Sequence, residues 1–194
     1  MESRFGYGRK MVDHDYKCIF IHGGRTGGTS IESSFEQPII LMEEGKHWTQ
    51  KTMRVKYSEY WKDYYKFSCV RNPYDLLVSI YFHNKQINYE WYEKTLNVDI
   101  RQLNFVDFLK VEGADTVLKY LDNLNEIDYI IRFEELQKGF DYVCGQIGKP
   151  KRLLERIGSS THELYMNYYD TREKIELVNE YMKDYFEIYG YEKW

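Results

Sequence analysis

Short runs of apolar residues alternate along the chain with longer segments in which apolar residues recur every three or four positions. The short runs are typical of buried strands, and the longer spacing is typical of helices that cover a sheet. Because helical segments separate the strands, the sequence predicts one α/β domain of three layers, with helices on both faces of a central parallel sheet. The expected strands are residues 17–22, 38–41, 67–70 and 128–131.

Helix boundaries are marked most clearly at three places. Asn72 is a good N-cap and Pro73 suits the first helical position, so a helix is expected directly after Arg71. Gly148 is expected to end the helix that precedes it. Asp170, with Glu173 three residues later, has the pattern of a capping box. The expected helices are residues 29–35, 50–64, 72–83, 105–110, 114–121, 133–147 and 170–190.

One internal segment fits neither pattern. Between Asn84 and Asn104 the regular spacing of apolar residues breaks down into polar and aromatic residues. We therefore expect a lid or an acceptor-facing insertion there. Its aromatic residues are compatible with sugars, lipids or peptides alike.

Composition limits the class of partner. The chain has 194 residues and a formal net charge of −4, so it is not a nucleic-acid binder of the polycationic type, and a basic site must be local. Its three cysteines lie far apart in apolar runs, which predicts reduced core thiols and no disulfide or metal cluster. Residues 1–15 are polar, and no apolar run is long enough to span a membrane. These features predict a soluble, cytoplasmic protein.

A glycine-rich turn follows the first strand, in the sequence His-Gly-Gly-Arg-Thr-Gly-Gly-Thr-Ser from His22 to Ser30. Glycines let the backbone approach a ligand closely, and N–H groups at the start of the next helix attract anions. Arg25 adds a full positive charge, so a phosphate or sulfate group is the expected ligand. The glycines with this role are Gly24, Gly27 and Gly28, and the hydroxyl donors are Thr26, Thr29 and Ser30.

The turn differs from the loop of nucleoside triphosphate enzymes, G-x-x-x-x-G-K-[ST]. Gly23 and Gly28 have the spacing of its glycines, but Thr29 stands where its lysine belongs. Those enzymes also need an acidic residue to hold magnesium, whereas two of the expected strands lead into Arg71 and Arg132. The sequence therefore disfavours a kinase with this loop, although a kinase stays an alternative.

Two motifs together resemble the PAPS-dependent sulfotransferases, in particular the branch with bacterial and Golgi carbohydrate sulfotransferases. The first is the run Phe20-Ile-His-Gly-Gly-Arg-Thr-Gly-Gly-Thr-Ser30, and the second is Phe67-Ser-Cys-Val-Arg-Asn-Pro-Tyr-Asp-Leu-Leu-Val-Ser79. They occur in the family's order, roughly forty residues apart. Weaker likeness lies in residues 128–136, 168–172 and 183–191, so the resemblance covers most of the chain.

The resemblance implies a P-loop-like fold and PAPS (3′-phosphoadenosine 5′-phosphosulfate) as cosubstrate, with no metal. Arg25 stands where the family has a lysine that contacts the 5′-phosphosulfate, and Arg71 with Ser79 matches the pair that holds the 3′-phosphate. His47 is the candidate general base that removes a proton from an acceptor hydroxyl, expected to be that of a carbohydrate. Glu32 is the runner-up base, although it is more simply read as a brace for the first helix.

Several assignments stay open at this level. Arg132 and Arg172 are candidates either for nucleotide contacts or for structural ion pairs, and His22 is expected to support the glycine-rich loop. The basic segment 149–161 either covers an anion or is simply solvated. A non-catalytic protein that binds sulfonucleotides is a further alternative. Neither the acceptor nor the oligomeric state follows from the sequence.

Overall fold

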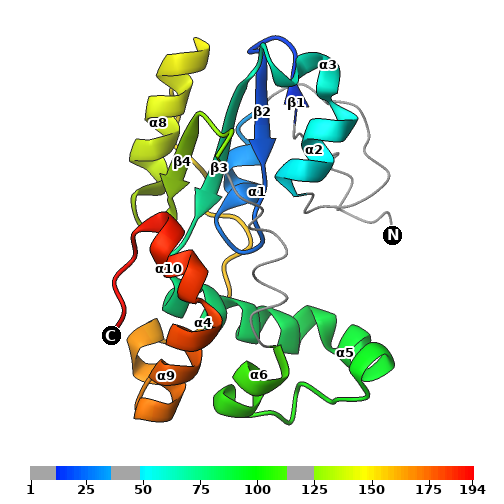
Figure 1. Ribbon diagram of the computed structural model, residues 1–194, viewed down its shortest axis with the longest axis vertical. Coiled ribbons are helices and arrows are strands. Elements are labelled where there is room, and N and C mark those ends of the chain that lie inside the picture. Colours follow the sequence, from blue (N-terminus) through cyan, green and yellow to red (C-terminus); the bar gives the residue numbers. More distant parts are fainter. Residues whose placement is uncertain (1–11, 36–48, 113–124) are drawn as a thin grey trace. The chain divides into compact units, whose positions relative to one another are not determined.

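The structure, a computed structural model, describes residues 12–35, 49–112 and 125–194 (Figure 1). The chain divides into two compact units. The first unit comprises the residues up to Val70 and those from Tyr120 to Gly158. The second unit comprises the residues from Arg71 to Lys119 and from Ser159 to Trp194. The sequence predicts that the whole chain is one domain. This expectation depends on how the two units are joined, and it stays a prediction.

A four-stranded sheet forms the centre of the first unit, in the order β1-β2-β3-β4. Its strands are β1 (Val12–Asp13), β2 (Cys18–Ile21), β3 (Tyr65–Val70) and β4 (Tyr129–Arg132). The parallel pairing of β2, β3 and β4 confirms the expected parallel sheet and brings their carboxyl ends to one edge. The antiparallel strand β1 was not predicted. The strand expected at residues 38–41 lies outside the described residues.

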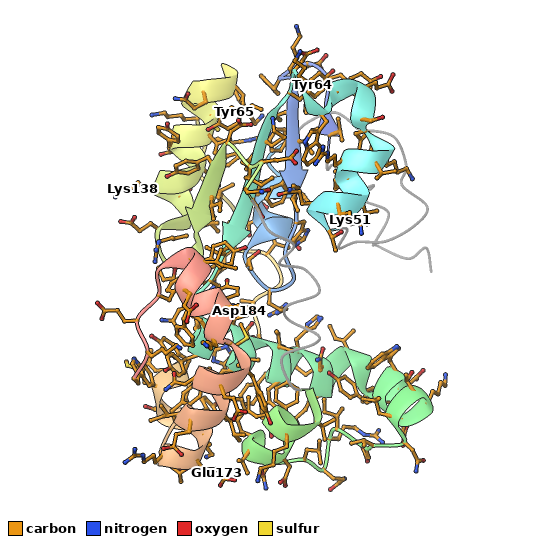
Figure 2. The ribbon with its side chains drawn as sticks, in the orientation of Figure 1. Lys51, Tyr64, Tyr65, Lys138, Glu173 and Asp184 are labelled. Atoms are coloured by element: carbon orange, nitrogen blue, oxygen red, sulfur yellow. The ribbon has the colours of Figure 1, made fainter. Side chains whose placement is uncertain are left out.

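Helices cover both faces of this sheet, which confirms the three-layer α/β fold (Figure 1). Residues of α1 (Gly28–Glu32) and α8 (Leu136–Ile147) pack on one face, and residues of α2 (Gln50–Lys56) and α3 (Ser58–Trp61) pack on the other. Exposed lysines on the two layers, Lys138 on α8 and Lys51 on α2, keep the outer surfaces polar (Figure 2). Cys18, Cys69 and Cys144 are buried and free, as predicted.

Two helices of the first unit differ from the predicted ones. The helix expected over residues 50–64 is broken at Tyr57, where φ is −115° and ψ is 34°. Met53, Tyr57 and Trp61 are still buried against the sheet, so the apolar spacing correctly located the packed face. The helix expected over residues 133–147 begins with a 3₁₀ turn, η2 (Phe133–Glu135), and ends at Gly148, which has a φ of 70°.

The second unit is helical. The N-cap prediction for α4 (Pro73–His83) is confirmed, because the Asn72 side chain accepts hydrogen bonds from the N–H groups of Tyr74 and Asp75. The chain then continues through a π-helix, η1 (Asn84–Asn88), into α5 (Tyr89–Leu96). In the segment 84–104, where the sequence showed no regular spacing of apolar residues, the first half is therefore helical. α6 (Phe105–Glu112) was predicted, whereas the helix expected at residues 114–121 lies outside the described residues.

The sequence predicts one helix over residues 170–190, but the structure has two, α9 (Arg172–Tyr181) and α10 (Lys183–Tyr189). The 3₁₀ helix η3 (Tyr165–Tyr168) precedes them. The predicted capping box is wrong, because the Asp170 carboxylate accepts a hydrogen bond from Lys174 Nζ and Thr171 is the N-cap residue. The buried aromatic residues of this unit pack together as its core: Tyr74, Tyr81, Tyr92, Phe105, Phe108, Tyr169, Tyr185, Phe186 and Tyr189.

Candidate functional site

The glycine-rich loop between β2 and α1 lies at the carboxyl edge of the parallel strands, where ligands gather in open α/β sheets. Gly27 has a φ of 84°, a left-handed conformation that favours glycine. A Cβ atom at Gly27 would also lie 2.8 Å from Leu136 and 3.1 Å from Phe133, so glycine is required for space as well. The loop is thus packed directly against the junction of β4 and α8.

A buried polar pair supports the loop from beneath. Nδ1 of His22 lies 2.8 Å from Oε1 of Glu32, and both side chains are almost fully buried. A Cβ atom at Gly28 would lie 2.1 Å from the His22 ring, so the ring occupies the space beside this glycine. Glu32 therefore contacts the imidazole at the end of β2, whereas the sequence placed it at the first helical turn.

The hydroxyl groups of the loop have different partners. Thr26 is buried, and its hydroxyl donates a hydrogen bond of 2.8 Å to the Gly23 carbonyl oxygen, which closes the turn internally. Ser30 Oγ accepts a hydrogen bond of 3.3 Å from the Ile157 N–H. Thr29 is half-buried. Of the three hydroxyls expected to face an anion, that of Thr26 serves the loop itself.

Helix α1 is shorter than predicted, since it covers only five residues from Gly28 to Glu32. Its first hydrogen bonds run from the N–H groups of Ser30 and Ile31 to the Gly27 carbonyl oxygen. A helix of little more than one turn has few aligned peptide dipoles, so its contribution to anion binding is small. An anion at this loop would therefore be attracted chiefly by the charge of Arg25 and by loop N–H groups.

Arg25 lies in the middle of the loop with a φ of 62°, which is uncommon for any residue other than glycine. Its Nη1 donates a hydrogen bond of 3.0 Å to the carbonyl oxygen of Gly158. The segment before Gly158 thus contacts the loop at two points, through Arg25 and through Ser30. Sequence reasoning noticed this segment for its basic residues and missed the backbone groups of Ile157 and Gly158.

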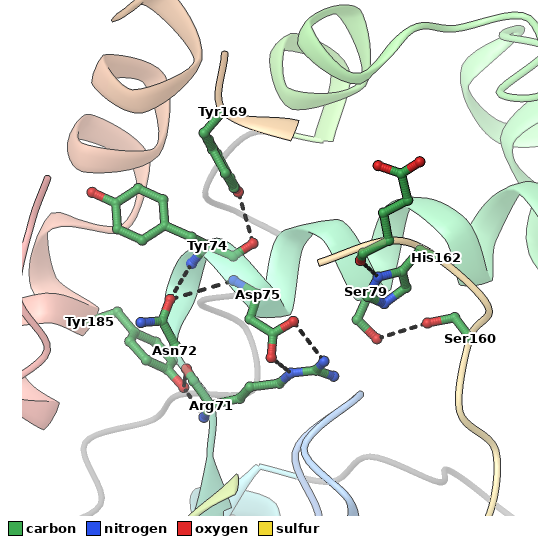
Figure 3. Close-up of polar contacts among 10 residues, drawn as sticks. Arg71, Asn72, Tyr74, Asp75, Ser79, Ser160, His162, Tyr169 and Tyr185 are labelled. Carbon is green, nitrogen blue, oxygen red and sulfur yellow. Dashed lines mark hydrogen bonds and ion pairs between the residues drawn. The ribbon is translucent and has the colours of Figure 1, made fainter. Parts of the chain in front are cut away.

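Arg71 begins the second unit and is held by a carboxylate one helical turn away. Its Nε and Nη2 donate hydrogen bonds of 2.7 and 2.8 Å to the two carboxylate oxygens of Asp75 (Figure 3). The Arg71 backbone exchanges two further hydrogen bonds with the hydroxyl of Tyr185. Asp75 lies in the first turn of α4 and also orients the guanidinium of Arg71.

Ser79 lies one further turn along α4 and is fully buried. Its Oγ lies 3.4 Å from Oγ of Ser160 (Figure 3). In the same segment, Nδ1 of His162 donates a hydrogen bond of 2.7 Å to the Glu163 carbonyl oxygen. Neither Ser160 nor His162 lies in a motif that could have identified it from the sequence.

The other cationic residues considered in the sequence are Arg132, Arg172 and those of the basic segment 149–161. Arg172 forms an exposed ion pair with Glu176, the structural alternative left open by the sequence. Arg132 is the exposed last residue of β4. In the basic segment, Lys149 is buried over the rings of Tyr16 and Phe35, and the exposed cations are Lys151, Arg152 and Arg156. His47, the candidate base, lies outside the described residues.

Metal-binding clusters and membrane-spanning helices are both absent from the described parts of the chain. No group of three or more His, Cys, Asp and Glu side chains there has the arrangement of a metal site. None of the helices described is both long and apolar enough to cross a lipid bilayer.

Comparison with known proteins identifies the fold. No protein-family model and no curated protein matches the sequence. Among solved structures, the chain is similar to the mouse sulfotransferase SULT7A1 complexed with PAP, with a TM-score of 0.54 and 14% sequence identity. The similarity covers 94% of this chain and 91% of that protein. The two proteins therefore share the P-loop-like α/β fold predicted from the sequence.

Proposed function

We propose that this protein is a PAPS-dependent sulfotransferase that moves a sulfuryl group from PAPS to an acceptor hydroxyl. The observation that carries the proposal is the loop from Gly23 to Gly28, with a cation at Arg25, at the carboxyl end of an interior parallel strand. The solved sulfotransferase of the same fold holds PAP, the product that PAPS leaves after transfer. Three free and buried cysteines fit the reducing, cytoplasmic location that the sequence predicts.

The glycine-rich loop is proposed to bind the 5′-phosphosulfate. Gly24, Gly27 and Gly28 are assigned backbone N–H contacts to the anion, and Thr29 and Ser30 add hydroxyl groups. In our assignment Thr26 contributes its backbone N–H, because its hydroxyl is bonded to Gly23. The Arg25 guanidinium supplies the positive charge and can contact two oxygens of the anion at once.

Arg71 and Ser79 are proposed to bind the 3′-phosphate. The bidentate contact with Asp75 fixes the plane of the Arg71 guanidinium before a ligand arrives, which lowers the entropy cost of binding. Ser79 is fully buried, and its Oγ lies 3.4 Å from Oγ of Ser160. Arg71 is therefore assigned the larger share of the affinity.

The proposed reaction is a single in-line displacement at sulfur. The acceptor oxygen forms a bond to sulfur while the bond between sulfur and the bridging oxygen of the 5′-phosphate breaks. The electron pair of the broken bond stays on the phosphate, where Arg25 and the loop N–H groups stabilise the growing charge. His47 is proposed to take the acceptor proton.

The acceptor is proposed to be a carbohydrate. Helix α5, within the segment 84–104 assigned to the acceptor, carries the exposed indole of Trp91. A flat, apolar aromatic face of this kind suits the apolar face of a sugar ring. Substitution of Trp91 by Ala is expected to raise the KM for the acceptor and to leave PAP affinity unchanged. A KM that stays constant would remove α5 from the acceptor site.

Isothermal titration distinguishes the proposed enzyme from a kinase with the same fold. We expect adenosine 3′,5′-bisphosphate (PAP) to bind without magnesium and ATP with magnesium to bind much more weakly. The order would be reversed for a kinase, which needs the metal to neutralise the triphosphate.

A transfer assay addresses the remaining alternative, a protein that binds the nucleotide without turnover. Labelled sulfate from PAPS should appear on at least one member of a panel of sugars, and the His47→Ala variant should lose this transfer while it still binds PAP. Tight PAP binding without transfer to any hydroxyl acceptor would favour the non-catalytic alternative.

A further inference from the structure

The segment from Arg152 to Gly158 has no regular secondary structure, yet hydrogen bonds attach it to the first unit along its length. The Gln137 side chain on α8 bonds to both the Arg152 carbonyl oxygen and the Leu154 N–H, at 3.0 and 2.8 Å. The Arg152 guanidinium donates to the Ser34 carbonyl oxygen. The 152–158 segment is thus fixed at its start, well before it reaches the glycine-rich loop.

The end of the 152–158 segment contacts two groups that the proposed function assigns to the phosphosulfate. The Ile157 N–H donates to Ser30 Oγ, and the Gly158 carbonyl oxygen accepts a hydrogen bond from Arg25 Nη1. Gly158 has a φ of 70°, a conformation that turns the carbonyl in a way few other residues allow. The position of this carbonyl therefore depends on glycine at residue 158.

The contact has a particular consequence for an arginine. Guanidinium N–H groups lie in one plane and point in different directions, so one edge can bond a fixed carbonyl while other edges face a ligand. A lysine ammonium is a single point of charge on a flexible stem and gains no comparable orientation from one carbonyl. The Arg25 backbone, at a φ of 62°, is itself in an uncommon conformation that needs support from its surroundings.

We propose that the 152–158 segment is the positioning element for Arg25, with the Gly158 carbonyl setting the orientation of the guanidinium toward the phosphosulfate. Gly158 is then a positioning residue, and its contact makes arginine effective where the sulfotransferase motif has lysine. The proposal rests on the proposed function. It predicts that damage to this contact reduces the rate of sulfuryl transfer more than the affinity for nucleotide, because orientation matters most for the charge that develops during the reaction.

The chain offers a matched pair of variants. Gly158 and Gly148 both have a φ of 70°, and a Cβ atom at either would meet no other atom within 4 Å. Both Gly158→Ala and Gly148→Ala therefore introduce the same backbone strain without a clash, but only Gly158 contacts Arg25. We expect Gly158→Ala to lower kcat with PAPS by about tenfold with a change in PAP affinity below about threefold, and Gly148→Ala to leave kcat within about twofold.

Hydrogen exchange supplies a readout that does not require an acceptor. Arg25→Lys should speed exchange of the Ile157 amide by about tenfold, and adding Gly158→Ala to Arg25→Lys should increase it little further, because both changes break one contact. The proposal would be overturned if the 152–158 segment exchanged at the same rate in Arg25→Lys and in the wild-type protein. Equal kcat values for the two alanine variants would also overturn it. If the wild-type protein does not bind PAP, the proposed function fails and the positioning role fails with it, even where the exchange results hold.

Discussion

The imidazole ring of His22 fills the space that a side chain at residue 28 would need, since a Cβ atom on Gly28 would lie 2.1 Å from the ring. The ring is also fixed from its other side by Glu32, at 2.8 Å. The close approach therefore cannot be relieved by a simple rotation of the ring. Glycine at residue 28 is required by packing on the interior of the loop, independently of any ligand.

Gly28→Ala is accordingly expected to destabilise the protein. Forcing a methyl group into this space should lower the free energy of unfolding by about 1–3 kcal/mol, and the displaced ring should weaken PAP binding as well. Chemical denaturation measures the first effect. Gly145→Ala is the matched control, because Gly145 lies on α8 with nothing within 4 Å of its Cβ position, and it should be neutral or stabilising. Equal effects of the two substitutions would refute the packing account.

Lys149→Met tests the buried ammonium of the basic segment. Lys149 Nζ lies 4.7 Å from the centre of the Tyr16 ring and 4.8 Å from that of Phe35, so the charge contacts two aromatic faces. Methionine keeps the apolar stem and removes the charge, which should lower the free energy of unfolding by about 1 kcal/mol. The neighbouring exposed Lys151 provides the control, and Lys151→Met should change stability by less than about 0.5 kcal/mol.

Stability should fall steeply at alkaline pH, in part through Tyr65. Burial, followed by the charges of Tyr142, Asp128 and Tyr129, raises the pKa of Tyr65 from 10 to about 12. The unfolded chain ionises this phenol from pH 10, whereas the folded protein keeps it neutral up to about pH 12. The stabilisation is therefore complete below pH 10 and is lost between pH 10 and 12.

The Tyr65→Phe variant checks this titration directly. Its free energy of unfolding should fall less steeply than that of the wild-type protein over the same pH interval. The difference in tyrosinate absorbance between the two folded proteins should show a midpoint near pH 12. A midpoint near pH 10, with equal slopes, would contradict the assigned burial effect.

Local sequence signals predicted the parts of the fold that depend on near neighbours. Asn72 caps α4 as expected, because the cap needs only the next three residues. Gly148 ends α8 through its own left-handed conformation. The parallel strands followed from their apolar runs. Such elements are specified by short-range chemistry and are visible in sequence alone.

The missed features depend on which of several nearby partners a residue contacts. Strand β1 has only two residues and exists through its pairing with β2. Asp170 had the sequence of a cap, but Lys174 is a competing partner for its carboxylate. The segment after Asn84 stays helical, and there the Asn84 side chain bonds the Tyr92 hydroxyl. Helix and strand propensities alone do not show which of these contacts forms.

The candidate site shows the same division. Motif spacing selected the glycine-rich loop, Arg25, Arg71 and Ser79 as ligand-binding candidates. It could not show that Arg25 contacts Gly158, 133 residues later, because nothing in the local sequence of either residue specifies the other. The pairing of Arg71 with Asp75 could have been predicted from the sequence, because side chains four positions apart lie close together on a helix.

Arg71 provides the most direct test of the proposed cosubstrate, through a thermodynamic cycle between the residue and the ligand's 3′-phosphate. Titrations would compare PAP with adenosine 5′-monophosphate, which lacks that phosphate, in the wild-type protein and in Arg71→Ala. Arg172→Ala is the matched control, because Arg172 also pairs with a carboxylate four residues later but lies on the exposed surface. We predict that the wild-type protein and Arg172→Ala bind PAP about 10- to 100-fold more tightly than the monophosphate, and that Arg71→Ala loses most of this preference. A preference that survives in Arg71→Ala, or that is missing from the wild-type protein, would contradict the assignment of a PAPS site.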